Sequence, residues 1–156
     1  MLRRVLLINL LFIFSCNSGN DLPYYNTPDF TPIFLTNNSV IEKTITHKIE
    51  DFSFINQNKN EISQQEIENK IHIANFIFTS CTSICPNMTN NMKLVESAFA
   101  NNPEVKILSY SVTPWIDTPE KLKSYIKQNE IKSENWHFLT GNKSEIYKLA
   151  RESYFA

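Results

Sequence analysis

The sequence predicts one α/β domain with a mostly parallel β-sheet flanked by helices. Strand-like and helix-like segments alternate from about residue 71 onward, with short connections between them. Residues 71–78 form an almost unbroken apolar run rich in β-branched and aromatic residues, which is typical of a central strand covered on both faces. The chain is 42% hydrophobic and 12% aromatic, and its 156 residues suffice for one buried core.

Residues 1–16 are predicted to be a lipoprotein-type signal peptide. Arg3 and Arg4 precede the apolar residues 5–14, and Ser15 then precedes Cys16. This apolar stretch is too short to span a bilayer, which needs about twenty residues. The pattern is similar to bacterial lipoprotein signals, in which Cys16 becomes the acylated first residue. We therefore expect a lipid-anchored protein of the bacterial cell envelope, on a membrane and facing the periplasm.

Residues 17–46 are predicted to be a polar tether, because they contain three prolines among Asn and Thr residues. One strand is expected around residues 39–46. The domain itself is placed at residues 47–156. It begins with a short strand-like stretch at residues 49–55, a turn cluster at residues 56–60, and a short helix or extended segment at residues 61–70.

Three helices and two further strands follow the apolar run. Pro86 suits the first turn of a helix that ends near residue 100. The methionines of this helix are expected in the core rather than among metal ligands. A strand at residues 105–112 precedes a helix that begins with Thr118 as N-cap and Pro119 at its first position. The last elements are a strand at residues 136–139 and a helix at residues 144–151.

The charge balance argues against nucleic acid as a partner. Fifteen Lys and Arg residues face sixteen Asp and Glu residues, and the net charge is −1. No basic block is present that would release counterions from a phosphate backbone.

Cys81 and Cys85 are the candidate functional pair. They lie four residues apart across a strand-to-helix turn, where ligands of open α/β sheets gather. Thiolates suit Cu(I), and one added imidazole would give a three-coordinate site for either common oxidation state of copper. The pair could instead exchange disulfides or form a structural disulfide, although so short a loop stabilises little. Zinc is poorly supported because no second ligand pair is present.

At these cysteines the chain resembles the Sco/SenC family. The run Asn75-Phe76-Ile77-Phe78-Thr79-Ser80-Cys81-Thr82-Ser83-Ile84-Cys85-Pro86 is similar to the family's Cys-x-x-x-Cys-Pro signature. Further matching segments fall in the family's order, namely Asp51-Phe52-Ser53-Phe54, Ser111-Val112-Thr113-Pro114, Asp117-Thr118-Pro119-Glu120 with Leu122, and Trp136 with Phe138-Leu139-Thr140-Gly141. The resemblance covers about residues 47–152.

The resemblance implies a thioredoxin-like fold that binds copper, as Cu(I) or Cu(II), through Cys81, Cys85 and a later histidine. It also implies a role in maturing the CuA centre of cytochrome c oxidase, with an oxidase subunit or another copper protein as partner. Two positions depart from the family, because Thr113 and Ile116 stand where many relatives have Asp and Arg. Asp117 is interpreted as a residue of the turn and helix start rather than a catalytic one.

The third copper ligand is expected outside the given chain. His47, His72 and His137 are the only histidines, and each is interpreted as a strand or loop residue rather than a ligand. A thioredoxin-like sheet ends in a hairpin and a helix, for which the segments up to Ala156 offer no matching pattern. We therefore expect an incomplete domain, with the histidine ligand beyond Ala156.

Two classes of function remain open from the sequence. The first is a copper chaperone for oxidase assembly, which is not an enzyme. The second is an enzyme, a periplasmic thiol–disulfide oxidoreductase that acts on cysteines of copper proteins. The three residues between the cysteines differ from the Cys-x-x-Cys of general disulfide exchangers and favour the first. A peroxiredoxin-like peroxidase is the weakest of the alternatives.

Overall fold

The computed structural model describes residues 22–35 and 44–156. The chain divides into two units, Met1–His47 and Lys48–Ala156. The predicted signal peptide, with Cys16, lies outside the described residues, as does most of the strand predicted at residues 39–46. In the first unit, Tyr24 and Ile33 form an antiparallel bridge with two backbone hydrogen bonds of 2.9 Å.

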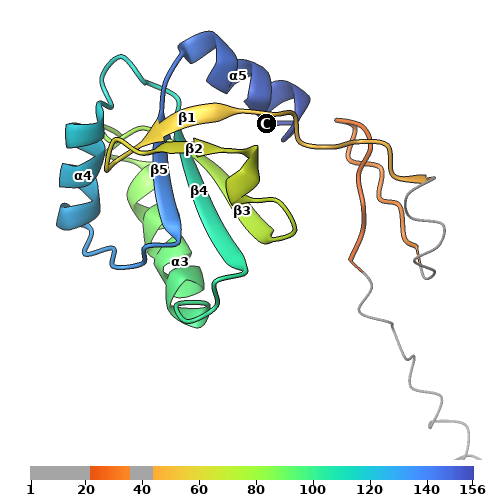
Figure 1. The fold of residues 1–156 in the computed structure, drawn as a ribbon, viewed down its shortest axis with the longest axis horizontal. Coiled ribbons are helices and arrows are strands. Elements are labelled where there is room, and N and C mark those ends of the chain that lie inside the picture. Colours follow the sequence, from red (N-terminus) through yellow and green to blue (C-terminus); the bar gives the residue numbers. More distant parts are fainter. Residues whose placement is uncertain (1–21, 36–43) are drawn as a thin grey trace, which may run out of the picture. The chain divides into compact units, whose positions relative to one another are not determined.

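The second unit is built on a five-stranded sheet with the order β2-β1-β5-β4-β3 (Figure 1). Its strands are β1 (Ser53–Asn56), β2 (Glu61–Ser63), β3 (Ile71–Ile77), β4 (Val105–Ser111) and β5 (Trp136–Thr140). Strands β3, β4 and β5 are parallel, and β1 runs antiparallel to both β5 and β2. The carboxyl ends of the three parallel strands therefore meet at one edge of the sheet.

Three α-helices connect and follow the parallel strands: α3 (Ile84–Ala98), α4 (Pro119–Gln128) and α5 (Lys143–Glu152). The N-cap of α4 is Thr118, whose hydroxyl accepts the Lys121 N–H, and Pro119 occupies the first helical position, as predicted. The segment predicted as a short helix or extended stretch contains β2 and a 3₁₀ helix, Gln64–Glu66.

Each face of the sheet carries its own hydrophobic core. Alternate residues of β4 point to opposite faces, so that Leu108 and Tyr110 pack on one side and Ile107 on the other. Helix α5 covers the first face, and α3 and α4 cover the second (Figure 1). Met88 and Met92 of α3 pack against the second core, as the sequence predicts.

The mixed α/β architecture is confirmed, but the position of β3 differs from the prediction. Among the described residues β3 pairs with β4 alone and forms an edge of the sheet. Its residues are mostly half-buried, with Ile71 68% exposed, whereas nearly all of β4 and β5 is buried. An apolar run indicates a strand, but how deeply that strand is buried depends on the strands and helices that pack beside it.

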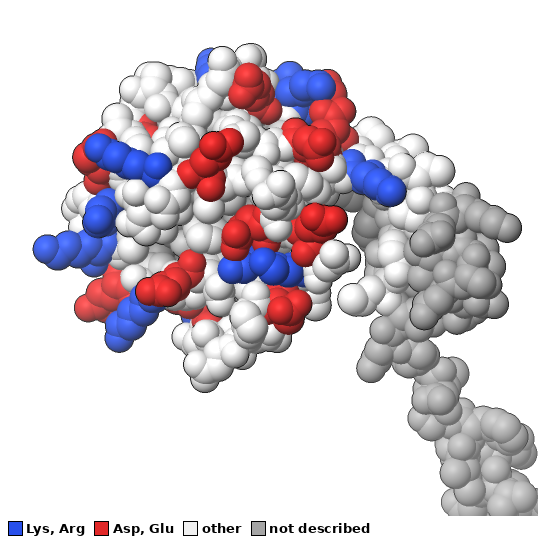
Figure 2. Space-filling view, in the orientation of Figure 1, with Lys and Arg blue, Asp and Glu red and all other residues white. Residues whose placement is uncertain are grey.

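The surface of this unit mixes acidic and basic side chains. In the view of Figure 2 the two signs alternate over the visible face, and neither forms a large continuous area. Across residues 22–35 and 44–156, no helix combines the length and the apolar character that crossing a membrane requires.

Candidate thiol and metal site

The two cysteines lie at the carboxyl end of β3, where the chain turns into α3. Cys81 is partly exposed in the loop, and its N–H donates to the Phe78 carbonyl at 3.2 Å. Cys85 is in the first turn of α3 and only 4% exposed. Its N–H donates to the Cys81 Sγ at 3.4 Å, and both thiols are free. The predicted pair is therefore brought together, with one sulfur accessible and the other covered.

This arrangement separates the acidities of the two thiols. Hydrogen bonds to the Cys81 sulfur, first from the Cys85 side chain and then from the backbone N–H groups of Cys85 and Ser83, lower the pKa of Cys81 to about 7. Burial, followed by the neighbouring Cys81 sulfur, raises the pKa of Cys85. Cys81 therefore ionises first, and the Cys85 thiol stays protonated and donates to it.

Asp117 joins the thiol-bearing loop to the end of β4. Its fully buried carboxylate accepts the Thr79 N–H at 3.2 Å and the Thr79 hydroxyl at 2.6 Å. It also accepts the Ser111 hydroxyl at 2.6 Å and the Thr113 hydroxyl at 3.1 Å. These donors come from two segments that meet at the carboxyl edge of the sheet, one after β3 and one at the end of β4. Asp117 does not cap α4, since Thr118 has that role.

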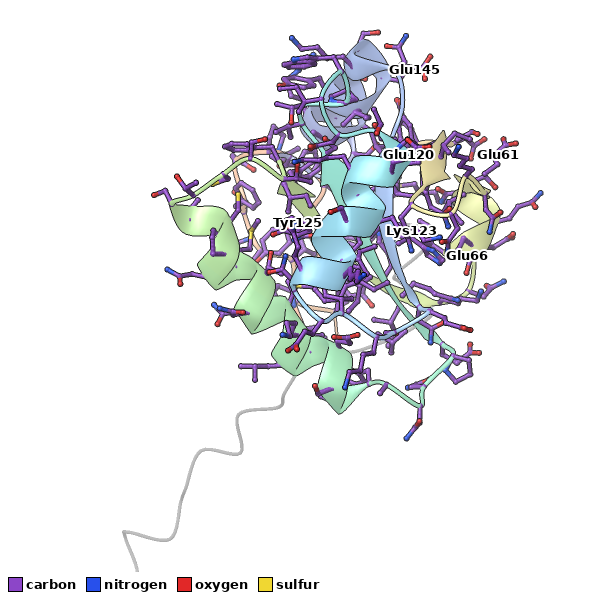
Figure 3. The ribbon with its side chains drawn as sticks, turned by 90° about the vertical axis from the view of Figure 1, so that its left-hand side faces the viewer. Glu61, Glu66, Glu120, Lys123, Tyr125 and Glu145 are labelled. Carbon is purple, nitrogen blue, oxygen red and sulfur yellow. The ribbon has the colours of Figure 1, made fainter. Side chains whose placement is uncertain are left out.

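Tyr125 and Thr89 join α4 to α3 near the cysteines. The two hydroxyls lie 2.7 Å apart, and Figure 3 shows Tyr125 on the side of α4 toward α3. Burial raises the pKa of Tyr125 by more than the hydrogen bond with Thr89 lowers it, and ionisation of the neighbouring Cys85, Cys81 or Asp117 adds to the increase. The tyrosine therefore stays protonated within electrostatic reach of the pair.

Large apolar side chains are exposed in the two loops that meet here. In the loop and first helical residue around the cysteines, Phe78 is 36% exposed and Ile84 71%. In the loop between β4 and α4, Trp115 is 59% and Ile116 46% exposed. The Lys143 ammonium group lies 4.7 Å from the centre of the Trp115 ring. The accessible Cys81 is thus flanked in the chain by apolar surface.

The donor chemistry of the pair fits a soft metal ion. Two sulfur ligands converge, and one of them ionises near neutral pH, as metal binding requires. No group of three or more His, Cys, Asp or Glu side chains in the described parts of the chain could hold a metal. The described residues therefore bring two sulfur atoms together, and copper binding by this pair stays a prediction, as does a third ligand beyond Ala156.

Two of the histidines lie in other hydrogen-bonded settings. His72 on β3 shares a 3.1 Å contact with the Tyr154 hydroxyl, and His137 on β5 is 3.4 Å from the Asn56 amide. Burial lowers the pKa of both imidazoles. His47 belongs to the first unit.

Sequence reasoning missed the hydrogen bonds that join the thiol-bearing loop to the end of β4. The hydroxyls of Thr79, Ser111 and Thr113 all bond to Asp117, and residues 79 and 117 are 38 positions apart. The available signal was the presence of hydroxyl residues directly after two predicted parallel strands, whose carboxyl ends lie at one edge.

Comparisons with known proteins agree with this fold. The sequence model of the SCO1/SenC family matches residues 42–156. The chain is 37% identical over 118 residues to a "SCO1 protein homolog" of Bacillus subtilis, covering 74% of this chain and 61% of that protein. The chain thus spans about three fifths of the length of this relative.

Two solved structures are similar to this chain in fold. One is BsSco, described as "a member of the Sco family of cytochrome c oxidase assembly proteins" in work that identified a disulfide switch. It is 38% identical with a TM-score of 0.64, over 70% of this chain and 66% of the other. The second is Arabidopsis thaliana ScoI with copper bound, 26% identical with a TM-score of 0.56, over 67% and 65%. These likenesses confirm the predicted thioredoxin-like fold of Sco proteins.

Proposed function

The chain belongs to the SCO1/SenC family, and from this premise we propose that it is a copper-binding assembly factor for cytochrome c oxidase. It would carry copper as cargo on Cys81 and Cys85 and deliver it to the CuA centre of an oxidase subunit. The observation that carries the proposal is the 3.4 Å contact between the Cys85 N–H and the Cys81 sulfur, with a Cys81 pKa of about 7.

The geometry supports copper because the pair is already arranged and partly ionised. A thiolate rather than a thiol binds the metal, so a pKa of about 7 lets Cys81 bind near neutral pH without a large proton cost. The covered Cys85 becomes the second ligand once it releases its proton. Copper-bound Arabidopsis ScoI and the BsSco oxidase-assembly protein support the same assignment by likeness.

A competition titration with a Cu(I) chelator tests the proposal. We expect the reduced wild-type chain to bind one Cu(I), and Cys81→Ser or Cys85→Ser to weaken binding at least about a hundredfold, because one soft ligand remains. Ser83→Ala is the matched control from the same loop, since the Ser83 side chain makes no cap hydrogen bond. Near-wild-type affinity in Cys85→Ser would disprove the site assignment.

Thiol–disulfide exchange is the second candidate, favoured by the unequal acidities of the two thiols. The Cys81 thiolate attacks a partner disulfide, forms a mixed disulfide and releases one partner sulfur as a thiolate. Cys85 then gives its proton to a released thiolate and attacks the Cys81 sulfur, which frees the second partner sulfur. The partner gains two electrons and ends with one thiol and one thiolate, and Cys81–Cys85 becomes the disulfide.

An assay with a cysteine-containing copper-site domain of an oxidase subunit separates the two candidates. If the protein is a chaperone, its copper-loaded form transfers the metal to the reduced domain, and the cysteines of that domain remain reduced throughout. With the reduced, metal-free protein, an oxidoreductase converts the oxidised domain to its dithiol form. The exposed apolar side chains of Trp115 and Ile116 support contact with such a partner in either case.

The envelope location is a separate part of the proposal and rests on the sequence. Lipid attached at Cys16 would hold the protein at a membrane and facing the periplasm. The intact mass of the protein purified from a bacterial membrane fraction tests this. We expect cleavage before Cys16 with acyl chains attached, and an unmodified Cys16 in the mature protein would refute it.

A further inference from the structure

The β3 and β4 strands separate just before the cysteines. The last backbone hydrogen bond between them runs from the Val112 N–H to the Ile77 carbonyl at 2.8 Å. Residues 78–83 and 112–118 are all described, and no backbone hydrogen bond joins the two segments. Between these two segments the direct hydrogen bonds therefore involve side chains.

Asp117 makes that connection through two hydrogen bonds to Thr79. Its Oδ2 accepts the Thr79 N–H and its Oδ1 accepts the Thr79 hydroxyl, which fixes the orientation of Thr79 as well as its position. The same Oδ2 accepts the Ser111 hydroxyl from the end of β4. Two residues after Thr79, the Cys81 N–H closes the turn onto the Phe78 carbonyl.

We propose that Asp117 is a positioning residue that holds the Cys81 turn in place for the proposed thiol and copper chemistry of the pair. This inference rests on the proposed function. Cys81 and Cys85 must be held close both to close a disulfide and to share one copper ion. Without the Asp117 bonds the loop samples other conformations, which lowers the effective concentration of one sulfur near the other.

A buried carboxylate could instead act through its charge, and the two roles predict different variants. Asp117→Ala removes every acceptor. Asp117→Asn removes the charge but keeps one oxygen for the Thr79 N–H, and its NH₂ can donate to the Thr79 hydroxyl. A positioning role therefore predicts that Asn restores most of what Ala loses, whereas a charge role predicts that both variants behave alike.

The test measures the reduction potential of the Cys81–Cys85 pair and, separately, Cu(I) affinity. We expect Asp117→Ala to weaken disulfide formation about tenfold, which raises the potential by about 30 mV. Cu(I) affinity should fall by a similar factor. Asp117→Asn should stay within about twofold of wild type in both measurements. If Asp117→Ala does not fold, Thr79→Val removes one of the bonds, and a potential shift in the same direction is expected.

Ser109→Ala is the matched control for a purely structural effect. Ser109 is also a fully buried hydroxyl on β4 and bonds to Asn75 and Trp136, away from the thiols. We expect it to lower stability and leave the potential unchanged.

The outcomes separate this inference from the proposed function. A wild-type chain that neither binds Cu(I) nor forms the disulfide would refute the proposed function. If the wild type does both and Asp117→Ala keeps its potential and affinity, the positioning inference alone is overturned. Equal losses in Asp117→Asn and Asp117→Ala would overturn it as well.

Discussion

Cys81 should react before Cys85 with an alkylating reagent, and its rate should reach half its maximum near pH 7. The reason is the hydrogen bonding that lowers the pKa of Cys81 to about 7, while burial raises the pKa of Cys85. Because the Cys85 side chain is the first cause of the lowered value, Cys85→Ala should move the midpoint upward. The midpoint should stay below that of an ordinary thiol, since the backbone donors of residues 83–85 remain.

The midpoint is a sharper measurement than the rate. At pH 7 about half of Cys81 is thiolate, against about 3% for a thiol with an ordinary pKa of about 8.5, a ratio of about fifteen. A less basic thiolate is also less nucleophilic, by about fivefold for this difference in pKa. The net advantage in rate is therefore only about threefold at neutral pH.

The assay is alkylation of the reduced protein with iodoacetamide, followed by peptide mass spectrometry, from about pH 5.5 to about pH 9. Cys85→Ser is the matched control for Cys85→Ala, because its hydroxyl can still donate to the Cys81 sulfur and should keep the midpoint low. A wild-type midpoint near that of an ordinary thiol, or labelling of Cys85 first, would refute the reasoning.

Three further predictions concern the stability of the domain. Gly141→Ala should cost about 1–3 kcal/mol in urea unfolding, because the new Cβ would lie 2.8 Å from the Phe54 ring. Asn142→Ala should cost about 1 kcal/mol by the same measurement, because its side chain accepts backbone N–H groups at the start of α5. Burial lowers the pKa of His137 below 6.5 despite the nearby Glu66 carboxylate, so the unfolded chain binds the proton first as pH falls. The free energy of unfolding should therefore decrease below about pH 6.5, and His137→Gln should reduce that dependence.

Local patterns predicted most of the fold, because strand and helix periodicity are properties of neighbouring residues. The helix start at Thr118 and the strand at residues 105–111 follow directly from caps and apolar spacing. The edge position of β3 could not be predicted, because the residues of a strand do not reveal how many neighbouring strands pair with it. Contacts such as Glu96 with the Lys132 and Ser133 N–H groups join distant residues and have no periodic signal.

The same dependence on local pattern explains why the sequence indicated the cysteine pair but not the Asp117 hydrogen bonds to the loop that carries it. Two thiols at a strand-to-helix turn are visible as a spacing in the sequence, and that spacing alone leaves copper binding and disulfide exchange open. The structure adds the unequal environments of Cys81 and Cys85 and the bonds of Asp117 to Thr79. Both candidate chemistries need one accessible thiolate beside a second sulfur in a fixed turn, so one arrangement can serve either. If the proposed chemistry is right, we therefore expect the partner that reaches the partly exposed Cys81, rather than the pair itself, to decide which reaction occurs.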